Sequence, residues 1–269
     1  MRLLPSAALL AALASAGCGP DDSALVKPPP AKPLETWTEG GFRAPRGGAP
    51  LSSDARLHRA EDLMQRERLA EAAAEYRELL SKDPKDVPAL VGLSRVAGRM
   101  GDASSSLTFI SRAVDVRPED GSLVNELAVA LVSSGRRKEA AKAFERANAL
   151  SPQDPSILIN ASLNWADLND WASAQQCAQR AAEKIPNDLY PWLLMGRFQV
   201  RQGKNAEAVP YLREASRRGP DNGLVHYHLG KALLAAGQRS EAAEPLRVVL
   251  RANPPPEIRK EVEALLAGR

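Results

Sequence analysis

The sequence predicts an all-α protein made of six tandem helix pairs and one C-terminal capping helix. Prolines recur at a step of 34 residues, at positions 84, 118, 152, 186, 220 and 254. Two further columns with the same step hold only small residues. The composition is 44% hydrophobic but only 4% aromatic, and its many alanines favour closely packed helices over a sheet core. A fixed period of this length indicates stacked units that bury one continuous core.

The small columns predict where paired helices meet. In each repeat a small residue on the first helix faces a small residue on the second, so that the two backbones approach closely. The first-helix column is Ala60, Ser94, Ala128, Ser162, Gly196 and Gly230. The second-helix column is Ala72, Ser106, Ala140, Ala174, Ala208 and Ala242. A third column, glycine at 101, 135, 203 and 237, predicts the turn between the helices, where glycine tolerates unusual dihedral angles.

The period sets the boundaries of each unit, because proline ends one helix pair and disfavours helix just before itself. The predicted repeats are residues 53–86, 87–120, 121–154, 155–188, 189–222 and 223–254. Residues 255–269 then predict a capping helix, with Ile258, Val262, Leu265 and Leu266 facing back onto the stack. A polar outer cap of this kind is what repeat arrays require for solubility.

These columns resemble the tetratricopeptide repeat, and the resemblance runs from Ser53 to Pro254 without an insertion or a deletion. It implies antiparallel helix pairs stacked into a right-handed superhelical solenoid with a concave groove. It also implies that the groove is lined by residues of the first helices.

The first residues, MRLLPSAALLAALASAGC, predict a secretion signal over residues 1–17. Arg2 supplies a positive start and an apolar segment follows it, too short for a spanning helix. The run Ser15-Ala16-Gly17-Cys18 resembles the cleavage site of bacterial lipoproteins. That resemblance implies that Cys18 becomes the first mature residue and carries lipid, and that Gly19 favours the outer membrane. An ordinary signal peptide with a chance cysteine is the alternative.

Residues 18–52 predict a tether between the lipid and the repeats, since the stretch from Gly19 to Ser52 holds seven prolines and five glycines without an apolar period. Two interpretations of Leu34, Trp37 and Phe42 stay open. They form a short docking motif, or the tether touches nothing specific.

Several functions are not expected. The net charge of +3, without a run of five basic residues, argues against nucleic-acid binding. The chain lacks the motifs of zinc proteases, phosphate-binding loops, serine hydrolases and dinucleotide enzymes. His226 and His228 lie two apart and point to different sides of a helix, so we expect helix packing rather than a metal site. We therefore expect no enzyme activity, cofactor or metal.

Binding of a protein partner in the groove is the expected role. Carrying the groove positions over from the resemblance places an apolar centre between two basic ends. The predicted groove residues are Arg95, Arg99, Asn125, Val129, Val132, Ile159, Leu163, Ala166, Arg197, Arg201 and Lys231. Such a surface suits a partner segment with acidic flanks. The alternative is that the arginines are solvated and that the apolar residues close onto a neighbouring helix.

A lipid signal, a tether, six repeats and a cap together resemble the pilotin lipoproteins of bacterial type IV pili. The resemblance implies a lipid-anchored envelope protein, facing the periplasm from the outer membrane, that helps the secretin or another envelope-complex subunit to assemble. The alternative is an adaptor lipoprotein that recruits or regulates an envelope enzyme, such as a protease or a cell-wall synthase.

Overall fold

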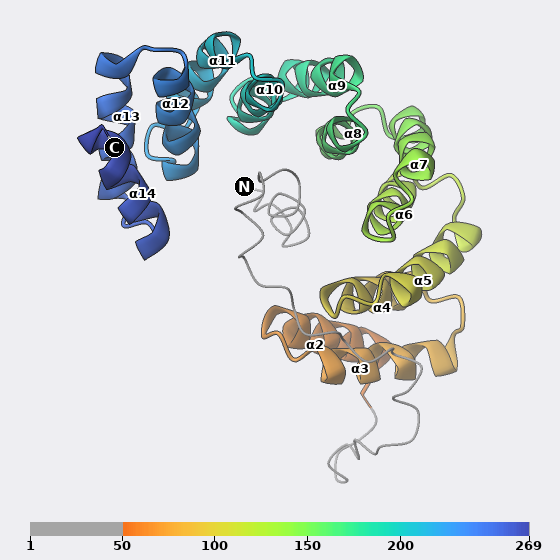
Figure 1. Ribbon diagram of the computed structural model, residues 1–269. Helices are drawn as coiled ribbons and strands as arrows, with labels where there is room; N and C mark the ends of the chain where they lie inside the picture. The colour runs from red at the N-terminus through yellow and green to blue at the C-terminus, as the bar shows by residue number, and fades with distance from the viewer. Residues whose placement is uncertain (1–50, 269) are drawn as a thin grey trace. The chain divides into compact units, whose positions relative to one another are not determined.

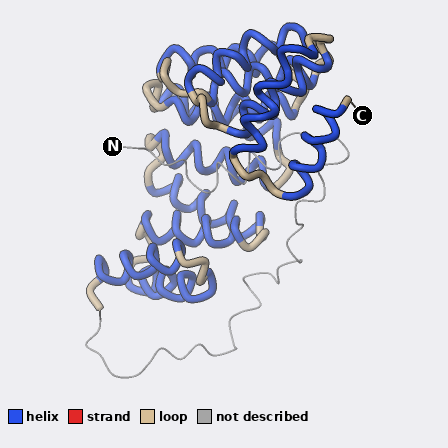
Figure 2. The backbone as a smooth tube through the Cα atoms, turned by 90° about the vertical axis from the view of Figure 1, so that its left-hand side faces the viewer, coloured by secondary structure: helices blue, strands red, loops and turns tan. Residues whose placement is uncertain are grey.

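The computed structural model describes residues 51–268, and every regular element in that range is a helix (Figure 1, Figure 2). These helices form two compact units that divide after Pro152. Each unit is a stack of antiparallel helix pairs. The predicted all-α fold of tandem helix pairs with a final cap is confirmed, whereas the predicted signal segment, Cys18 and tether lie outside the described residues.

The first unit holds three helix pairs. Their helices are α2 (Ser53–Gln65), α3 (Leu69–Lys82), α4 (Val87–Arg99), α5 (Ala103–Val116), α6 (Gly121–Ser133) and α7 (Arg137–Leu150). Within this unit each second helix also packs on the first helix of the following pair.

The second unit holds three pairs and the cap. Its helices are α8 (Pro155–Asp167), α9 (Trp171–Lys184), α10 (Tyr190–Arg201), α11 (Asn205–Arg218), α12 (Gly223–Ala235), α13 (Arg239–Arg251) and α14 (Pro256–Ala267). The cap packs on α13, and its Val262 is fully buried, which closes the apolar end of the stack.

The small columns lie where the sequence places them, at the contact between paired helices. All twelve residues are buried. In the second pair the Oγ of Ser94 lies 2.9 Å from the carbonyl oxygen of Ser106 and 3.1 Å from its Oγ. In the fifth pair a Cβ on Gly196 would lie 2.6 Å from Cγ of Leu212. Small residues are therefore needed for two different reasons, a hydrogen bond in one pair and a leucine side chain in the other.

The turn column also behaves as predicted. Gly101, Gly135, Gly203 and Gly237 have φ between 75° and 78°. The two repeats without glycine place Glu67 (φ 57°) and Asn169 (φ 60°) in the same left-handed conformation. This region disfavours residues other than glycine, although asparagine tolerates it better than most.

A further column with the same step of 34 residues, not among the predicted columns, precedes the first helices and caps them. Its members are Ser52, Asp86, Asp120, Asp154, Asp188 and Asn222. Asp86 accepts a hydrogen bond from the amide of Ala89 at 2.9 Å, and Asn222 accepts one from Val225 at 3.1 Å. These residues start the first helices by satisfying amides that lack a partner within the helix.

Candidate partner-binding site

The structure divides the predicted groove residues between the two units. Unit 1 holds five of them, on consecutive first helices: Arg95 and Arg99 on α4, and Asn125, Val129 and Val132 on α6. The two arginines are exposed and the other three residues are half-buried. Since α4 and α6 are in contact, these side chains form one surface of unit 1.

The two predicted groove arginines of unit 1, Arg95 and Arg99, also link neighbouring repeats. Arg95 donates to a carboxylate oxygen of Glu126 at 2.6 Å, and Nη1 of Arg99 donates to the carbonyl oxygen of Met64 at 2.8 Å. Burial alone would lower the pKa of Arg95, but the hydrogen bond and charge of Glu126 raise it above the ordinary value. Arg95 therefore stays charged, with that charge partly neutralised by Glu126.

In unit 2 the apolar residues predicted for the groove are less accessible than expected. Ile159 and Leu163 are each 8% exposed, and Ala166 is completely buried. The methyl group of Ala166 packs between helices and is closed to a partner, which corrects its placement on the groove surface. Ile159 and Leu163 expose only a small part of their side chains to solvent.

The basic residues of unit 2 lie on α10 and α12, and each has a defined environment. Arg201 lies 3.5 Å from a carboxylate oxygen of Asp167 and stacks over the ring of Trp171 at 5.0 Å. Arg197 is half-buried on the same helix. These contacts hold the side chains in place and reduce the net positive charge of this surface.

Lys231 is tied to the capping helix. Its Nζ lies 3.0 Å from the hydroxyl of Tyr227 and 3.0 Å from a carboxylate oxygen of Glu261 on α14. The same hydroxyl donates to the other oxygen of Glu261 at 2.8 Å. Burial lowers the pKa of Lys231, but the bonds to Tyr227 and Glu261 outweigh it and raise the pKa overall.

The histidine pair is part of the packing, as the sequence predicts for His226. This residue is 7% exposed, and its Nε2 lies 2.8 Å from the carbonyl oxygen of Pro220. His228 packs its ring against Tyr227 at 5.7 Å. Over residues 51–268 the structure brings together no group of three or more potential metal ligands.

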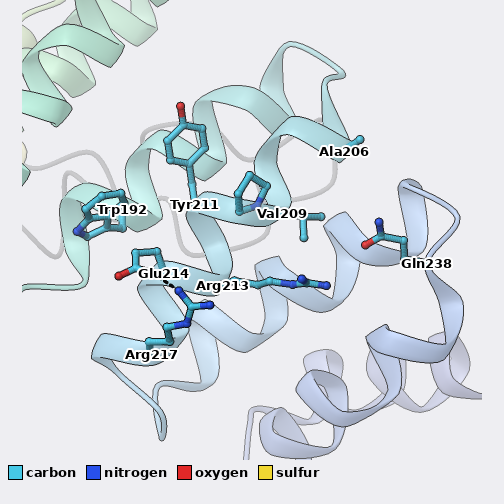
Figure 3. A pocket seen from close by; sticks show the side chains of 9 residues that line it. Trp192, Ala206, Val209, Tyr211, Arg213, Glu214, Arg217 and Gln238 are labelled. Atoms are coloured by element: carbon cyan, nitrogen blue, oxygen red, sulfur yellow. Dashed lines mark hydrogen bonds and ion pairs between the residues drawn. The ribbon is translucent and has the colours of Figure 1, made fainter.

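A recess in unit 2 was not anticipated from the sequence (Figure 3). It has a volume of about 600 Å³ and is built mainly by the second helix α11. Its lining residues are Trp192, Ala206, Val209, Pro210, Tyr211, Arg213, Glu214, Arg217 and Gln238. The ring of Trp192 is only half-buried, so part of it is exposed to the recess. The signal available was a tryptophan and a tyrosine at columns where other repeats carry smaller or charged side chains.

None of the helices within residues 51–268 is both long enough and apolar enough to cross a membrane. The predicted lipid site at Cys18 lies outside that range, so the anchor remains a prediction.

Comparison with solved structures finds the same fold in other proteins built of stacked helix pairs. PilW, described as a widely conserved type IV pilus biogenesis factor, superimposes with a TM-score of 0.70, at 17% identity, over 80% of this chain and 99% of PilW. The PilF protein of Pseudomonas aeruginosa gives a TM-score of 0.64 at 18% identity, over 79% of this chain and 96% of PilF. At these identities the similarity shows the fold.

Curated relatives share the repeats but are much longer. The human aspartyl/asparaginyl beta-hydroxylase is 26% identical over 199 residues, which cover 69% of this chain and 26% of the hydroxylase. The cellulose synthase operon protein C of Komagataeibacter xylinus is 30% identical over 116 residues, which cover 41% of this chain and 9% of that protein. The chain thus spans about a quarter of the hydroxylase and less of the other protein.

The family comparison agrees with the period and the helix pairs. Residues 63–130, 122–154 and 193–255 each match a tetratricopeptide-repeat family, and together these ranges cover more than half of the chain. These ranges include residues of every helix pair described above except α8 and α9. The chain therefore belongs to the tetratricopeptide-repeat family.

Proposed function

We propose that this chain is a non-enzymatic scaffold of the bacterial envelope, anchored through lipid on Cys18, that assists assembly of the type IV pilus secretin. The observation that carries the proposal is the match to PilW, which spans 99% of that pilus biogenesis factor and 80% of this chain. The lipoprotein-like residues Ser15 to Cys18 support the anchor, and the pilotin-like order of signal, tether and repeats supports the secretin.

The first-helix surfaces are the proposed docking sites. In unit 1, Val129 and Val132 offer half-buried apolar area beside Arg95 and Arg99. An extended or helical partner segment would bury its apolar side chains there and place carboxylates near the guanidinium groups. The link from Arg95 to Glu126 favours a partner with modest negative charge, since Glu126 already neutralises part of the surface.

The proposal is tested by deleting the gene in the native bacterium and measuring secretin multimers on immunoblots of outer membranes. We expect multimers to fall on deletion and to return with the unaltered chain. Cys18→Ala should fail to restore them, because the scaffold then no longer stays at the membrane. Normal multimers in the deletion strain would overturn the pilus role and favour the adaptor function instead.

A second arm tests the surface. Neutralising Arg95, Arg99 and Arg201 together with glutamine should lower multimer formation while leaving helicity unchanged, since exposed ion pairs contribute less than about 1 kcal/mol each. The matched control replaces three exposed arginines of second helices, Arg112, Arg146 and Arg247, in the same way. Equal loss in both triple variants would show that general charge, rather than the first-helix surface, is responsible.

A further inference from the structure

The recess on α11 carries a mixed set of groups that no other repeat combines. One wall is aromatic and is formed by the half-buried rings of Trp192 and Tyr211 (Figure 3). Pro210 also lines the recess. Basic side chains of Arg213 and Arg217 lie at its rim. A volume of about 600 Å³ is in the range of sites that hold a large side chain together with some backbone.

Trp192, one of the two aromatic residues of the wall, is held by a neighbouring arginine. The guanidinium of Arg218 stacks over the ring of Trp192 at 4.6 Å. Arg218 also donates to the carbonyl oxygen of Pro186 at 2.5 Å and to the carboxylate of Glu214. These contacts restrict the movement of Trp192, and a side chain that is already ordered binds a ligand without the entropic cost of ordering it.

The charges around the recess do not balance. Arg217 lies 2.5 Å from Glu214, Arg218 pairs with the same carboxylate, and Arg213 pairs with Glu241. Three guanidinium groups thus share two carboxylates. Hydrogen bonds from Arg218 and then Arg217 hold the pKa of Glu214 below its ordinary value, so this carboxylate stays ionised. Its single negative charge can be balanced by Arg218 alone.

Arg217 is the group that this arrangement leaves available. Its side chain is 74% exposed, compared with 20% for Arg218. It can turn from Glu214 to a carboxylate of a ligand, because Arg218 remains as the partner of Glu214. After this exchange Glu214 is still paired with Arg218.

A proline inside the helix adds an acceptor at the same place. Pro210 lies within α11 and has no N–H, so the carbonyl of Ala206, four residues earlier, lacks its helical donor. Ala206 is exposed and lines the recess. This carbonyl can accept a backbone N–H from an extended peptide.

We propose that the recess on α11 binds an extended segment of a partner protein that places an aromatic side chain against Trp192 and Tyr211 and an adjacent carboxylate on Arg217. The site goes beyond the first-helix surfaces of the proposed function and does not depend on them, because its main element is a second helix. It gives unit 2 a second point of attachment, so that one chain can hold two segments at once.

The test is a titration of the full chain with two fluorescent peptides that differ only in the two charged residues beside phenylalanine, Gly-Ser-Asp-Phe-Asp-Ser-Gly and Gly-Ser-Lys-Phe-Lys-Ser-Gly. Fluorescence anisotropy measures binding at low salt and at about 0.5 M salt. We expect the acidic peptide to bind several-fold more tightly than the basic one, with an affinity that falls as salt rises.

Arg217→Glu should weaken binding of the acidic peptide about tenfold, and Tyr211→Ala should weaken it at both salt concentrations. The matched control is Arg247→Glu. Arg247 is 61% exposed and lies 3.7 Å from Glu244 three residues away, but it does not line the recess. Circular dichroism checks that each variant keeps its helices.

Equal affinities for the two peptides, no detectable binding of the acidic one, or an equal loss in Arg247→Glu would each overturn the proposal. Loss of secretin assembly in the arginine variants of the first helices has no bearing on these outcomes, so the two proposals fail separately.

Discussion

Unit 1 and unit 2 use the same 34-residue plan but hold their surfaces differently. In unit 1, Arg95 binds a carboxylate and Arg99 a backbone carbonyl of the neighbouring repeat. In unit 2, three cations lie over aromatic rings: Arg201 over Trp171, Arg218 over Trp192 and Lys231 over Tyr227. Both units keep small residues in the buried columns, so the difference between their surfaces lies in residues outside these columns. The repeated columns form the stacked helix pairs. The side chains at the variable positions determine which surface each unit exposes to a partner.

The contact between paired helices also differs between the two units. The substitution with the largest expected effect on stability lies in unit 2. Leu212 is fully buried and fills the space over Gly196. Leu212→Ala should leave a cavity and cost about 2–5 kcal/mol. Hydrogen exchange should speed up in α10 and α11 and stay unchanged in α4 to α6, because stacked repeats depend mainly on their neighbours. Uniform acceleration across both units would contradict this locality.

The corresponding test in unit 1 enlarges a small residue. Ala128 is fully buried on α6, and Ala128→Leu should overpack its contact with α7 at a cost of about 1–3 kcal/mol. Chemical denaturation of the full chain measures the loss, and hydrogen exchange should place it in unit 1. A denaturation curve unchanged from the original chain would remove Ala128 from the contact between these helices.

The serine pair of unit 1 predicts a smaller effect. Ser94→Ala removes the hydrogen bond to the carbonyl of Ser106 without creating a large cavity, so we expect a loss of about 0.5–1.5 kcal/mol. The measurement is the same denaturation, with the exposed Ser122 changed to alanine as the control. A loss as large as that of Leu212→Ala would mean that the two kinds of contact are equivalent after all.

Substitutions in the turn column should have the smallest effect on stability. They allow the same position of the repeat to be compared in unit 1 and unit 2. Glu67 and Asn169 both have positive φ. Glu67→Gly should stabilise unit 1 by up to about 1 kcal/mol, because it relieves a conformation that costs a side chain energy. Asn169→Gly should gain less, since asparagine tolerates this conformation. Thermal melting measures both, and a larger gain at Asn169 would contradict the explanation.

Much of the fold could be predicted because it depends on columns that repeat. The prolines, the glycine turns and the buried small residues each follow from local chain geometry. Even the missed caps were present in the sequence, as Asp86, Asp120 and their equivalents. The burial of Phe198, which is 2% exposed, depends instead on the neighbouring helix pair, because its ring centroid lies 6.5 Å from that of Trp171.

The candidate surfaces could be predicted only in part, because they depend on which side chain meets which across repeats. The pairing of Arg95 with Glu126 joins residues 31 apart, and no local pattern selects that partner. The burial of Ala166 depends on how closely α8 packs with its neighbours. The recess depends on how the side chains of Trp192, Tyr211 and Pro210 fit together in space. A repeat pattern in the sequence does not predict the shape of such a surface.

The most direct test of the scaffold is photo-crosslinking in the native bacterium from exposed positions on the two kinds of helix. A photoreactive amino acid would replace Arg99 or Lys231 on first helices, and Arg112 or Lys142 on second helices. Immunoblots for the secretin then measure the adducts. We predict secretin adducts from the first-helix positions and none from Arg112 or Lys142. Adducts only from the second-helix positions, or none from any of the four, would contradict docking on the first-helix surfaces.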